Sequence, residues 1–233
     1  LLVISLAHAV NPSLYKLPYD PIKDFAPITL GVSAHLVLVS HPSFPAKTVK
    51  DVIAMARAKP GAITYGSPGN GTSGHLGMEM IRVAGKLVMV HVPYKGASPA
   101  LTDLLGGQIA LYLSSIPPAV PLINSGRLKA LGVSGAKRNG SLPNVPTIAE
   151  SGIPGYAVDN WYGVAAPVGT PKEVITRLNT ELTKILNMPE IRERYAKEGS
   201  ETAPTTPDEF AAFIRNEVEK WGKVVREANV KVD

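Results

Sequence analysis

The stretch YGSPGNGTSGHLG, residues 65–77, decides the fold class, because it ends a strand-like segment and opens a helix-like one. Its glycines at positions 66, 69, 71 and 74 permit positive φ angles and close approach of the backbone. The segment before it, AITYGS, is typical of a strand. The segment after it carries Leu76, Met80, Ile81 and Ala84 at helical spacing. A strand, a glycine-rich turn and a helix together indicate an α/β unit.

The same alternation continues on both sides of this stretch. A capping box at Thr48 and Asp51 predicts a helix whose inner face carries Val49, Ile53, Met55 and Ala56. Residues 87–94, 108–115 and 128–135 are strand-like, while 98–107 and 117–126 are helix-like. Parallel strands need long crossover connections, which helices normally supply. The sequence therefore predicts a parallel sheet with helices on both faces.

Two long extended segments, residues 24–42 and 156–169, bracket the alternating region. We interpret them as crossings between two lobes, with lobe 1 formed by residues 1–30 and 161–233 and lobe 2 by residues 31–160. Three helices should follow the second crossing, two of them starting at Thr170-Pro171 and Thr206-Pro207 with threonine as N-cap. The last helix has an apolar stripe that needs a surface to cover it: Phe210, Phe213, Ile214, Val218, Trp221 and Val225.

The first ten residues, LLVISLAHAV, resemble the apolar segment and Ala-x-Ala cleavage site of a secretory signal. A signal would carry a basic segment in front and a longer apolar run. We therefore interpret residues 1–5 as a buried parallel strand that opens into a loop. No stretch approaches the roughly 20 apolar residues of a membrane-spanning helix.

Composition excludes several classes of site. The chain of 233 residues has 24 basic and 19 acidic residues, but the basic ones are scattered and only 6% of residues are aromatic, which argues against a nucleic-acid surface. Cysteine is absent, which excludes disulfides, thiolate metal sites and cysteine nucleophiles. His8 and His91 lack the helical spacing and the neighbouring carboxylates of a zinc site. We expect neither a metal nor a cofactor.

The head of the helix after residue 72 is a candidate anion site. The first amides of a helix have no intrahelical partner, and the helix dipole adds partial positive charge there. Side chains of Ser67, Asn70, Thr72 and Ser73 add neutral donors. The alternative, that Thr72 or Ser73 only caps the helix, stays open. The glycine spacing fits neither a dinucleotide fingerprint nor a P-loop, which would need a lysine.

Two other residues have alternative interpretations. His75 lies one turn into the same helix, where it either donates to a carboxylate or is an ordinary surface or interface histidine. Lys95, in VPYKGASPA, follows a strand; a solvated lysine is the first interpretation, and an anion-binding or Schiff-base lysine the second.

Several blocks in colinear order over nearly the whole chain resemble one family, the Bug receptors, also called the TctC family: NPSLYKLPYDPIKDFAPIT, YGSPGNGTSGHL, VHVPYKGASPALTDLLGGQI, GRLKALGVSGAKR, LPNVPTIAESGIPGY, WYGVAAPVGTP and EKWGKVVREANVKVD. These are periplasmic solute-binding proteins of tripartite tricarboxylate transport systems. The resemblance implies a two-lobed, type II flytrap architecture and a receptor that binds a small carboxylate unchanged and delivers it to membrane transporter subunits.

The resemblance also implies site residues. In the family, loops from both lobes hold one carboxylate, and the matching positions are Ser5, Ala7 and His8 in lobe 1 and Ser67, Asn70, Gly71, Thr72, Ser73 and His75 in lobe 2. A later strand end often reads FDNLP in the family, but here it is Leu113-Ser114-Ser115-Ile116-Pro117, without an acid. We therefore expect a ligand without an amino group, near Ser114 and Ser115. The alternative is that these serines only satisfy local backbone.

The chain departs from the family at its start, because family members begin with two β-α units that have no match here. We therefore expect an incomplete first lobe, with an unpaired sheet edge and an exposed helical stripe that favour self-association. Two other functions are alternatives to this interpretation. A ligand-sensing domain of a regulator is the alternative to a receptor, but no helix-turn-helix segment is present. A hydrolase using Ser73 and His75 is disfavoured, because side chains two apart on a helix do not face each other.

Overall fold

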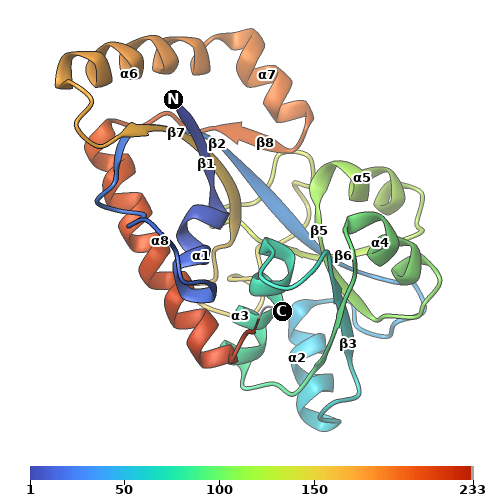
Figure 1. The fold of residues 1–233 in the computed structure, drawn as a ribbon. Coiled ribbons are helices and arrows are strands. Elements are labelled where there is room, and N and C mark those ends of the chain that lie inside the picture. Colours follow the sequence, from blue (N-terminus) through green and yellow to red (C-terminus); the bar gives the residue numbers. More distant parts are fainter. Residues whose placement is uncertain (232–233) are drawn as a thin grey trace. The chain divides into compact units, whose positions relative to one another are not determined.

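The computed structural model describes residues 1–231 (Figure 1). Contacts divide the chain into two compact units. Unit 1 comprises Leu1–Ala34 and Asn160–Arg226, and unit 2 comprises His35–Asp159 and, within the described part of the chain, residues 227–231. The unit boundaries fall inside β2 (Phe25–Ser40) and at the start of β7 (Asp159–Pro167), the two segments predicted as long extended crossings. The division into family lobes at residues 30/31 and 160/161 stays a prediction.

Unit 2 is built on a mixed sheet. Its strands β3 (Thr64–Ser67), β4 (Val90–Pro93) and β5 (Leu111–Ser115) are parallel, with β3 in the middle. The second half of β2 runs antiparallel to β5 and to β6 (Lys129–Val133). The predicted parallel sheet is therefore confirmed for β3, β4 and β5. Strand β2, which was predicted as a crossing outside the alternating region, joins this sheet and runs antiparallel to β5 and β6.

The helices described in unit 2 are α2 (Val49–Ala58), α3 (Ser73–Gly85), α4 (Ala97–Leu105) and α5 (Ile116–Asn124). The predicted capping box of α2 is present, since Thr48 accepts from the Asp51 amide and Asp51 accepts from the Thr48 amide. One apolar cluster joins strands β2, β5 and β6 to helices α4 and α5; its buried members include Val37, Leu104, Tyr112 and Ala119. The turn between β3 and α3 lies at the end of this sheet.

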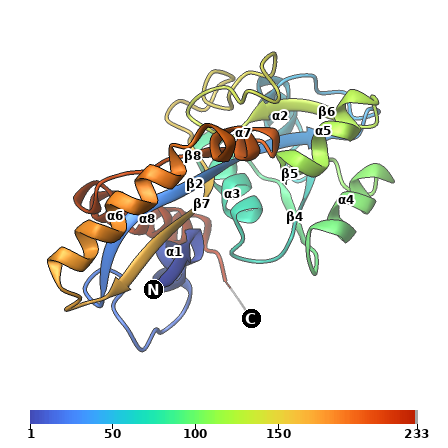
Figure 2. The ribbon, with the colours of Figure 1, turned by 90° about the horizontal axis from the view of Figure 1, so that it is seen from above.

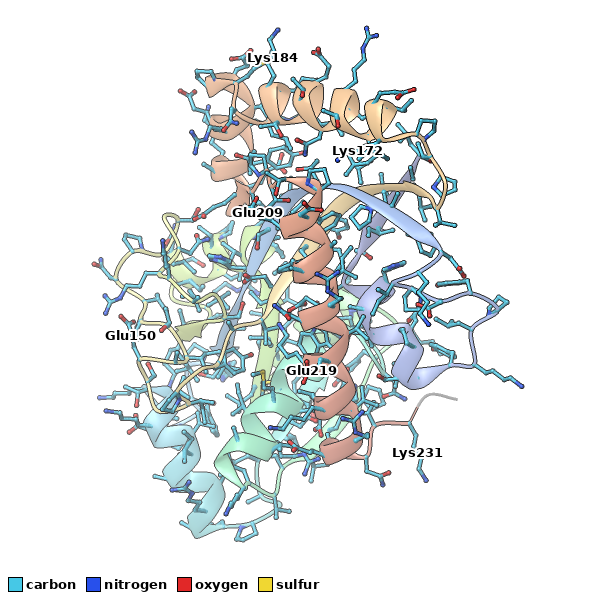
Figure 3. The ribbon with its side chains drawn as sticks, turned by 90° about the vertical axis from the view of Figure 1, so that its left-hand side faces the viewer. Glu150, Lys172, Lys184, Glu209, Glu219 and Lys231 are labelled. Carbon is cyan, nitrogen blue, oxygen red and sulfur yellow. The ribbon has the colours of Figure 1, made fainter. Side chains whose placement is uncertain are left out.

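Unit 1 contains β1 (Leu2–Ser5), β7, the first half of β2 and β8 (Ser200–Thr202), with helices α1 (Leu6–Leu14), α6 (Lys172–Leu186), α7 (Pro189–Lys197) and α8 (Pro207–Ala228). Strand β8 pairs antiparallel with β2. Helix α6 packs on β2 and β7 through a cluster around Ile28, Ala166 and Ile175 (Figure 2). The long helix α8 starts at a capping box formed by Thr206 and Glu209 (Figure 3).

The start of the chain differs from the prediction. Strand β1 is antiparallel to β7, pairing Leu2 with Ala165, and it is not buried, since Leu2 and Val3 are 46% and 70% exposed. The predicted loop after Ser5 is also wrong, because α1 begins at Leu6. Five apolar residues at a chain start suggest burial, but only Ile4 and Leu6 reach the core.

The C-terminal helices correct two further predictions. Helix α6 has Pro171 rather than Thr170 at its N-cap, since the Thr170 hydroxyl donates to the Pro167 carbonyl instead. The apolar stripe of α8 is not exposed, because Phe210 and Trp221 are fully buried. Gly163 of β7 makes room for this contact: a Cβ there would lie 2.1 Å from Phe210 Cζ.

Candidate functional site

Three helices of unit 2 begin at one edge of its sheet. Because β3, β4 and β5 are parallel, their carboxyl ends meet there, and α4 and α5 begin within a few residues of the ends of β4 and β5 (Figure 1). Helix α3 follows β3 through the glycine-rich turn. Ligands of open α/β sheets bind outside the carboxyl ends of the strands, where helix N-termini offer amides. This edge is therefore the candidate site.

The turn from Ser67 to Thr72 is closed by its own hydrogen bonds. The Gly69 carbonyl accepts from the Thr72 hydroxyl at 2.8 Å and from the Thr72 amide at 3.4 Å. The Gly69 amide donates to Ser67 Oγ at 3.2 Å. Gly69 and Gly71 have φ angles of +140° and +74°, which only glycine adopts easily. The sequence of the turn thus specifies its backbone.

Some donors of the turn are used within the protein and others are left over. The Gly71 amide donates to His75 Nδ1 at 3.1 Å, and the His75 amide donates to Thr72 Oγ1. Among the described residues 1–231, no protein acceptor is recorded for the amides of Asn70, Ser73 and Gly74. Together with the Ser73 hydroxyl and the exposed Asn70 side chain, they form a set of neutral donors at a helix head.

A stack of aromatic rings lies against the turn. The His75 and His91 rings are parallel with centroids 3.9 Å apart, and Tyr65 stacks on His91 at 5.0 Å. His91 Nε2 lies 2.7 Å from Ser67 Oγ. Because β3 and β4 pair in parallel with Tyr65 opposite His91, the pairing register places these two rings side by side. The stack therefore joins strand β4 and helix α3 to the turn.

Beyond the rings the network ends in an ion pair. The buried Glu79 carboxylate accepts a hydrogen bond from the Tyr65 hydroxyl. Arg82, one turn further along α3, donates to both carboxylate oxygens of Glu79 at 2.6 to 3.0 Å. A buried carboxylate needs such partners, since its unpaired charge would be costly.

Burial sets the charge of these groups. It lowers the pKa of His75 to about 4, and the nearby His91 ring adds to that effect. Burial also lowers the pKa of His91, which the Glu79 carboxylate partly opposes. Hydrogen bonding to Glu79 raises the pKa of Arg82. At neutral pH both histidines are thus uncharged, and the turn offers dipoles rather than a full positive charge.

The predicted site residues in and beside the turn fall into two groups. Asn70, Ser73 and the backbone around them offer donors at the edge. Ser67 is fully buried and, with Thr72 and His75, is engaged in bonds that shape the turn. Ser67 therefore stabilises the shape of the turn and does not offer an exposed hydroxyl to a ligand.

Ser114 and Ser115 follow β5 at the same edge. The buried Ser114 hydroxyl donates to the Ser115 carbonyl at 2.9 Å, which agrees with the alternative that this serine satisfies local backbone. Ser115 is exposed and is the N-cap residue of α5. The turn packs on this strand end, since a Cβ at Gly74 would lie 3.0 Å from the Leu113 carbonyl oxygen.

Lys95 lies in the loop that follows β4. The amides on either side of it, Tyr94 and Gly96, donate to the carbonyls of Ser67 and Pro68 at 3.0 Å, so this loop is fixed to the turn. The Lys95 side chain is exposed, as the solvated interpretation expects, whereas a Schiff-base lysine would be desolvated.

The predicted residues of unit 1 form a separate group at the start of α1. Ser5 is the N-cap residue and makes no side-chain capping bond, and Ala7 is exposed in the first turn. His8 is buried, with Nε2 2.8 Å from the Pro21 carbonyl oxygen and its ring edge-on to Phe25. Burial lowers the pKa of His8. This histidine thus anchors the loop that follows α1.

Sequence reasoning missed His91 and Glu79. The signal for His91 was its place opposite Tyr65 in paired strands, which needs the register and not only the segments. Glu79 lies on the apolar side of α3, and a charged residue among Leu76, Met78 and Ile81 was the available sign. Among residues 1–231 there is no group of three or more histidines or carboxylates suited to a metal, and no helix long and apolar enough to cross a membrane.

Comparison with known proteins identifies the family. The family described as "Tripartite tricarboxylate transporter family receptor" matches residues 1–230. The chain belongs to this family. It is 35% identical over 229 residues to a UPF0065 protein of a Pseudomonas species, from the tcbD-tcbE intergenic region, and 33% identical over 225 residues to BugT of Bordetella pertussis. These alignments cover 97% and 96% of the chain but 68% and 69% of the two relatives.

Solved structures of the family share the fold. Rpa4515 of Rhodopseudomonas palustris, solved with adipate, matches with a TM-score of 0.83 and 32% identity over 98% of this chain and 77% of that one. MatC of the same organism, solved with malate, matches with a TM-score of 0.75 and 28% identity over 95% and 75%. The periplasmic binding protein BugD matches with a TM-score of 0.80 and 32% identity, over 98% of this chain and 78% of that one. The family consists of solute-binding receptors for small carboxylates, and its characterised members are periplasmic.

Proposed function

We propose that this family member is a non-catalytic periplasmic receptor that binds one carboxylate group of a small acid at the head of α3 and delivers the acid to a tripartite transporter. The observation that carries the proposal is the set of unused donors at the turn: the amides of Asn70, Ser73 and Gly74 and the Ser73 hydroxyl. A helix N-terminus with unpaired amides favours an anion. Structural relatives solved with adipate and with malate support a carboxylate as that anion.

The neutrality of the turn suits a receptor. Hydrogen bonds to charged groups are stronger than those between neutral groups, so amides and hydroxyls suffice to bind a carboxylate. Because the proposed donors include no lysine or arginine to form an ion pair with it, the carboxylate can still dissociate. The uncharged His75 and His91 add no full charge. A transport receptor must release its ligand, and this donor set allows that.

Binding without turnover follows from the place of His75. Its Nδ1 accepts the Gly71 amide and its ring stacks on His91, so it is not positioned to take a proton from Ser73. A hydrolase would need a nucleophile and a base within hydrogen-bond reach. We therefore propose that the chain has no enzymatic activity.

The ligand class is proposed from the end of β5. No acidic residue follows this strand; Ser114 and Ser115 stand there, and the Ser114 hydroxyl is used locally. An ammonium group bound at this edge would lack a carboxylate partner, and such a group is costly to desolvate. We propose an aliphatic dicarboxylate or an aromatic acid without an amino group. Ser5, Ala7 and His8 at the start of α1 are proposed as the ligand-binding positions of unit 1.

Calorimetry tests the proposal with succinate, adipate, benzoate, aspartate and glutamate as probes. We expect measurable binding for at least one acid without an amino group and a clear preference over the amino acids. A preference for aspartate or glutamate would overturn the ligand class, and the absence of binding for all probes would count against a carboxylate receptor.

A designed variant tests the turn itself. Ser73→Pro removes one amide donor and one hydroxyl, while proline is well tolerated at the first helical position and Thr72 already has the extended backbone that precedes a proline (φ −71°, ψ 160°). We expect an unchanged circular dichroism spectrum and at least about a tenfold loss of affinity. Ser73→Ala, which keeps the amide, should lose less. Unchanged affinity in Ser73→Pro would place the carboxylate elsewhere.

A further inference from the structure

His91 has no role in the site as described above, although its stack with His75 touches the turn at two points. We propose that His91 is a positioning residue for the carboxylate-binding turn, which it holds in shape through the Ser67 hydroxyl and the His75 ring. This inference rests on the proposed function for its effect on a ligand. Its effect on the turn can be measured without any ligand.

The first point of contact is Ser67. His91 Nε2 lies 2.7 Å from Ser67 Oγ, and the same oxygen lies 3.2 Å from both the amide and the carbonyl oxygen of Gly69. Ser67 is fully buried, so water cannot replace these partners. Without His91, the hydroxyl keeps only its two weaker contacts to Gly69, and the turn loses its fixed point at the end of β3.

The second point of contact is Gly71. Its amide donates to His75 Nδ1, which accepts only while that nitrogen carries no proton. The other ring nitrogen of His75 therefore holds the proton of the neutral ring. The His91 ring, 3.9 Å away and nearly parallel, fixes the plane of His75 and with it the direction of Nδ1. The stack thus fixes the Gly71 amide on His75 Nδ1, while the amides of Asn70, Ser73 and Gly74 have no protein acceptor among the described residues.

Burial lowers the pKa of both rings and so keeps them neutral, while the Glu79 carboxylate partly opposes this shift. From β3, the Tyr65 ring stacks on His91; from α3, Glu79 and Arg82 form an ion pair that Tyr65 joins through its hydroxyl. These are the charged and titratable groups that face the stack from the two elements packed against it. A proton on His75 Nδ1 would turn the acceptor of the Gly71 amide into a second donor facing it.

The consequence is a coupling between the half-buried His91 ring on β4 and the donors at the head of α3. His91 contacts no donor of the proposed carboxylate site directly. Its replacement should therefore change affinity through the geometry of Gly69 and Gly71, and a side chain that restores the bond to Ser67 should restore both.

Two variants of matched size separate this role from simple packing. His91→Gln places an amide group near the position of Nε2 and can bond Ser67 Oγ, whereas His91→Leu fills similar space without a polar atom. In ¹H–¹⁵N spectra of the ligand-free chain, we expect His91→Leu to move the amide signals of Gly69 and Gly71 strongly and His91→Gln to move them less. With adipate or succinate as calorimetric probe, His91→Leu should lose about tenfold in affinity and His91→Gln no more than about threefold.

Each outcome decides the inference. If Gly69 and Gly71 signals in His91→Leu coincide with those of the unaltered chain, His91 does not position the turn. If they move but the affinity of a bound probe does not, the coupling to the ligand is wrong. If both variants lose affinity equally, only packing matters. Should no probe bind the unaltered chain, the proposed function fails, while the ligand-free spectra still confirm or refute the effect of His91 on the turn; Ser67→Ala serves as the second variant if His91→Leu does not fold.

Discussion

In the part of the chain that the structure describes, each unit contains one buried glutamate in the middle of a helix, Glu79 on α3 and Glu217 on α8. Each forms an ion pair with a cation three residues later, Arg82 in one case and Lys220 in the other. In both, the cation is partly exposed while the carboxylate is not. The same local device thus brings a charge into the interior of both units.

The two carboxylates differ in what they hold. Glu217 accepts the indole N–H groups of Trp161 and Trp221, both at 2.9 Å, and so ties strand β7 to helix α8. Glu79 accepts the Tyr65 hydroxyl, and Tyr65 leads through His91 to the turn. The Glu217 carboxylate therefore stabilises the packing of two buried tryptophans. The Glu79 carboxylate instead stabilises side chains that lie against the turn with the free donors.

The largest effect is expected in unit 1. Glu217→Leu leaves two buried indole N–H groups without an acceptor, so the free energy of unfolding should fall by about 3 to 5 kcal/mol. Urea denaturation measures this. The control is Glu219→Leu, two residues away on the exposed side of α8 (Figure 3), which should cost less than about 0.5 kcal/mol. Equal losses in both variants would mean that Glu217 is not a structural acceptor.

Overpacking at Gly163 should come next. Its Cβ would lie 2.1 Å from Phe210 Cζ, so Gly163→Ala should destabilise unit 1 by about 2 to 3 kcal/mol. A smaller side chain at position 210 should relieve the clash. In a double-mutant cycle, Phe210→Leu together with Gly163→Ala should therefore lose less stability than the sum of the two single changes. Additive losses would contradict the close approach.

Acid should weaken unit 2 through its histidines. Because burial lowers the pKa of His75 from 6.5 to about 4, the unfolded chain binds more protons than the native state between these pH values. The free energy of unfolding therefore falls as the pH drops from 6.5 towards 4, by about 1 kcal/mol per pH unit for this residue. His75→Gln should flatten that slope in denaturant titrations at several pH values. An unchanged slope would show that His75 is protonated in the native state.

A neutral replacement of the glutamates separates their roles. Glu79→Gln keeps an acceptor for Tyr65 but loses the charge that pairs with Arg82, and we expect a loss of about 1 to 2 kcal/mol in stability together with weaker binding of adipate. Glu217→Gln should lose a similar amount of stability with unchanged affinity. If both variants bind equally well, the network beneath the turn is not connected to the ligand.

The smallest effect concerns the helix caps. Thr48→Ala removes an observed capping box of α2 and should cost about 1 kcal/mol, measured by thermal unfolding. Thr170→Ala, at the position where the sequence suggested a cap that the structure lacks, should cost less than about half of that. A larger loss at Thr170 than at Thr48 would reverse this interpretation.

The sequence predicted the parts of the fold that depend on local patterns. The alternation of strands and helices in unit 2, the capping boxes at Thr48 and Thr206, and the extended nature of β2 and β7 all follow from spacing and composition. Strand direction was not local information: the apolar run at the start of the chain suggested a buried parallel strand, whereas β1 pairs antiparallel with β7. The prediction of Thr170 as an N-cap was wrong because helix α6 starts one residue later than the motif suggests.

The candidate site was predictable in part. Glycines and hydroxyl residues in one turn indicated a helix head with free donors, and the structure forms that head at α3. The supporting network was not predictable, because it requires that Tyr65 and His91 be opposite each other in paired strands and that α3 place His75 on the same stack. Such contacts come from packing between elements far apart in the sequence.

A titration of the chain with adipate, followed by ¹H–¹⁵N spectra, tests the central claim most directly. If the head of α3 binds the carboxylate, the largest shifts should occur at the amides of Asn70, Ser73 and Gly74, which lack protein acceptors among the described residues. The Gly71 amide, already bonded to His75, should move less. Saturable binding that leaves these three amides unchanged would contradict the account.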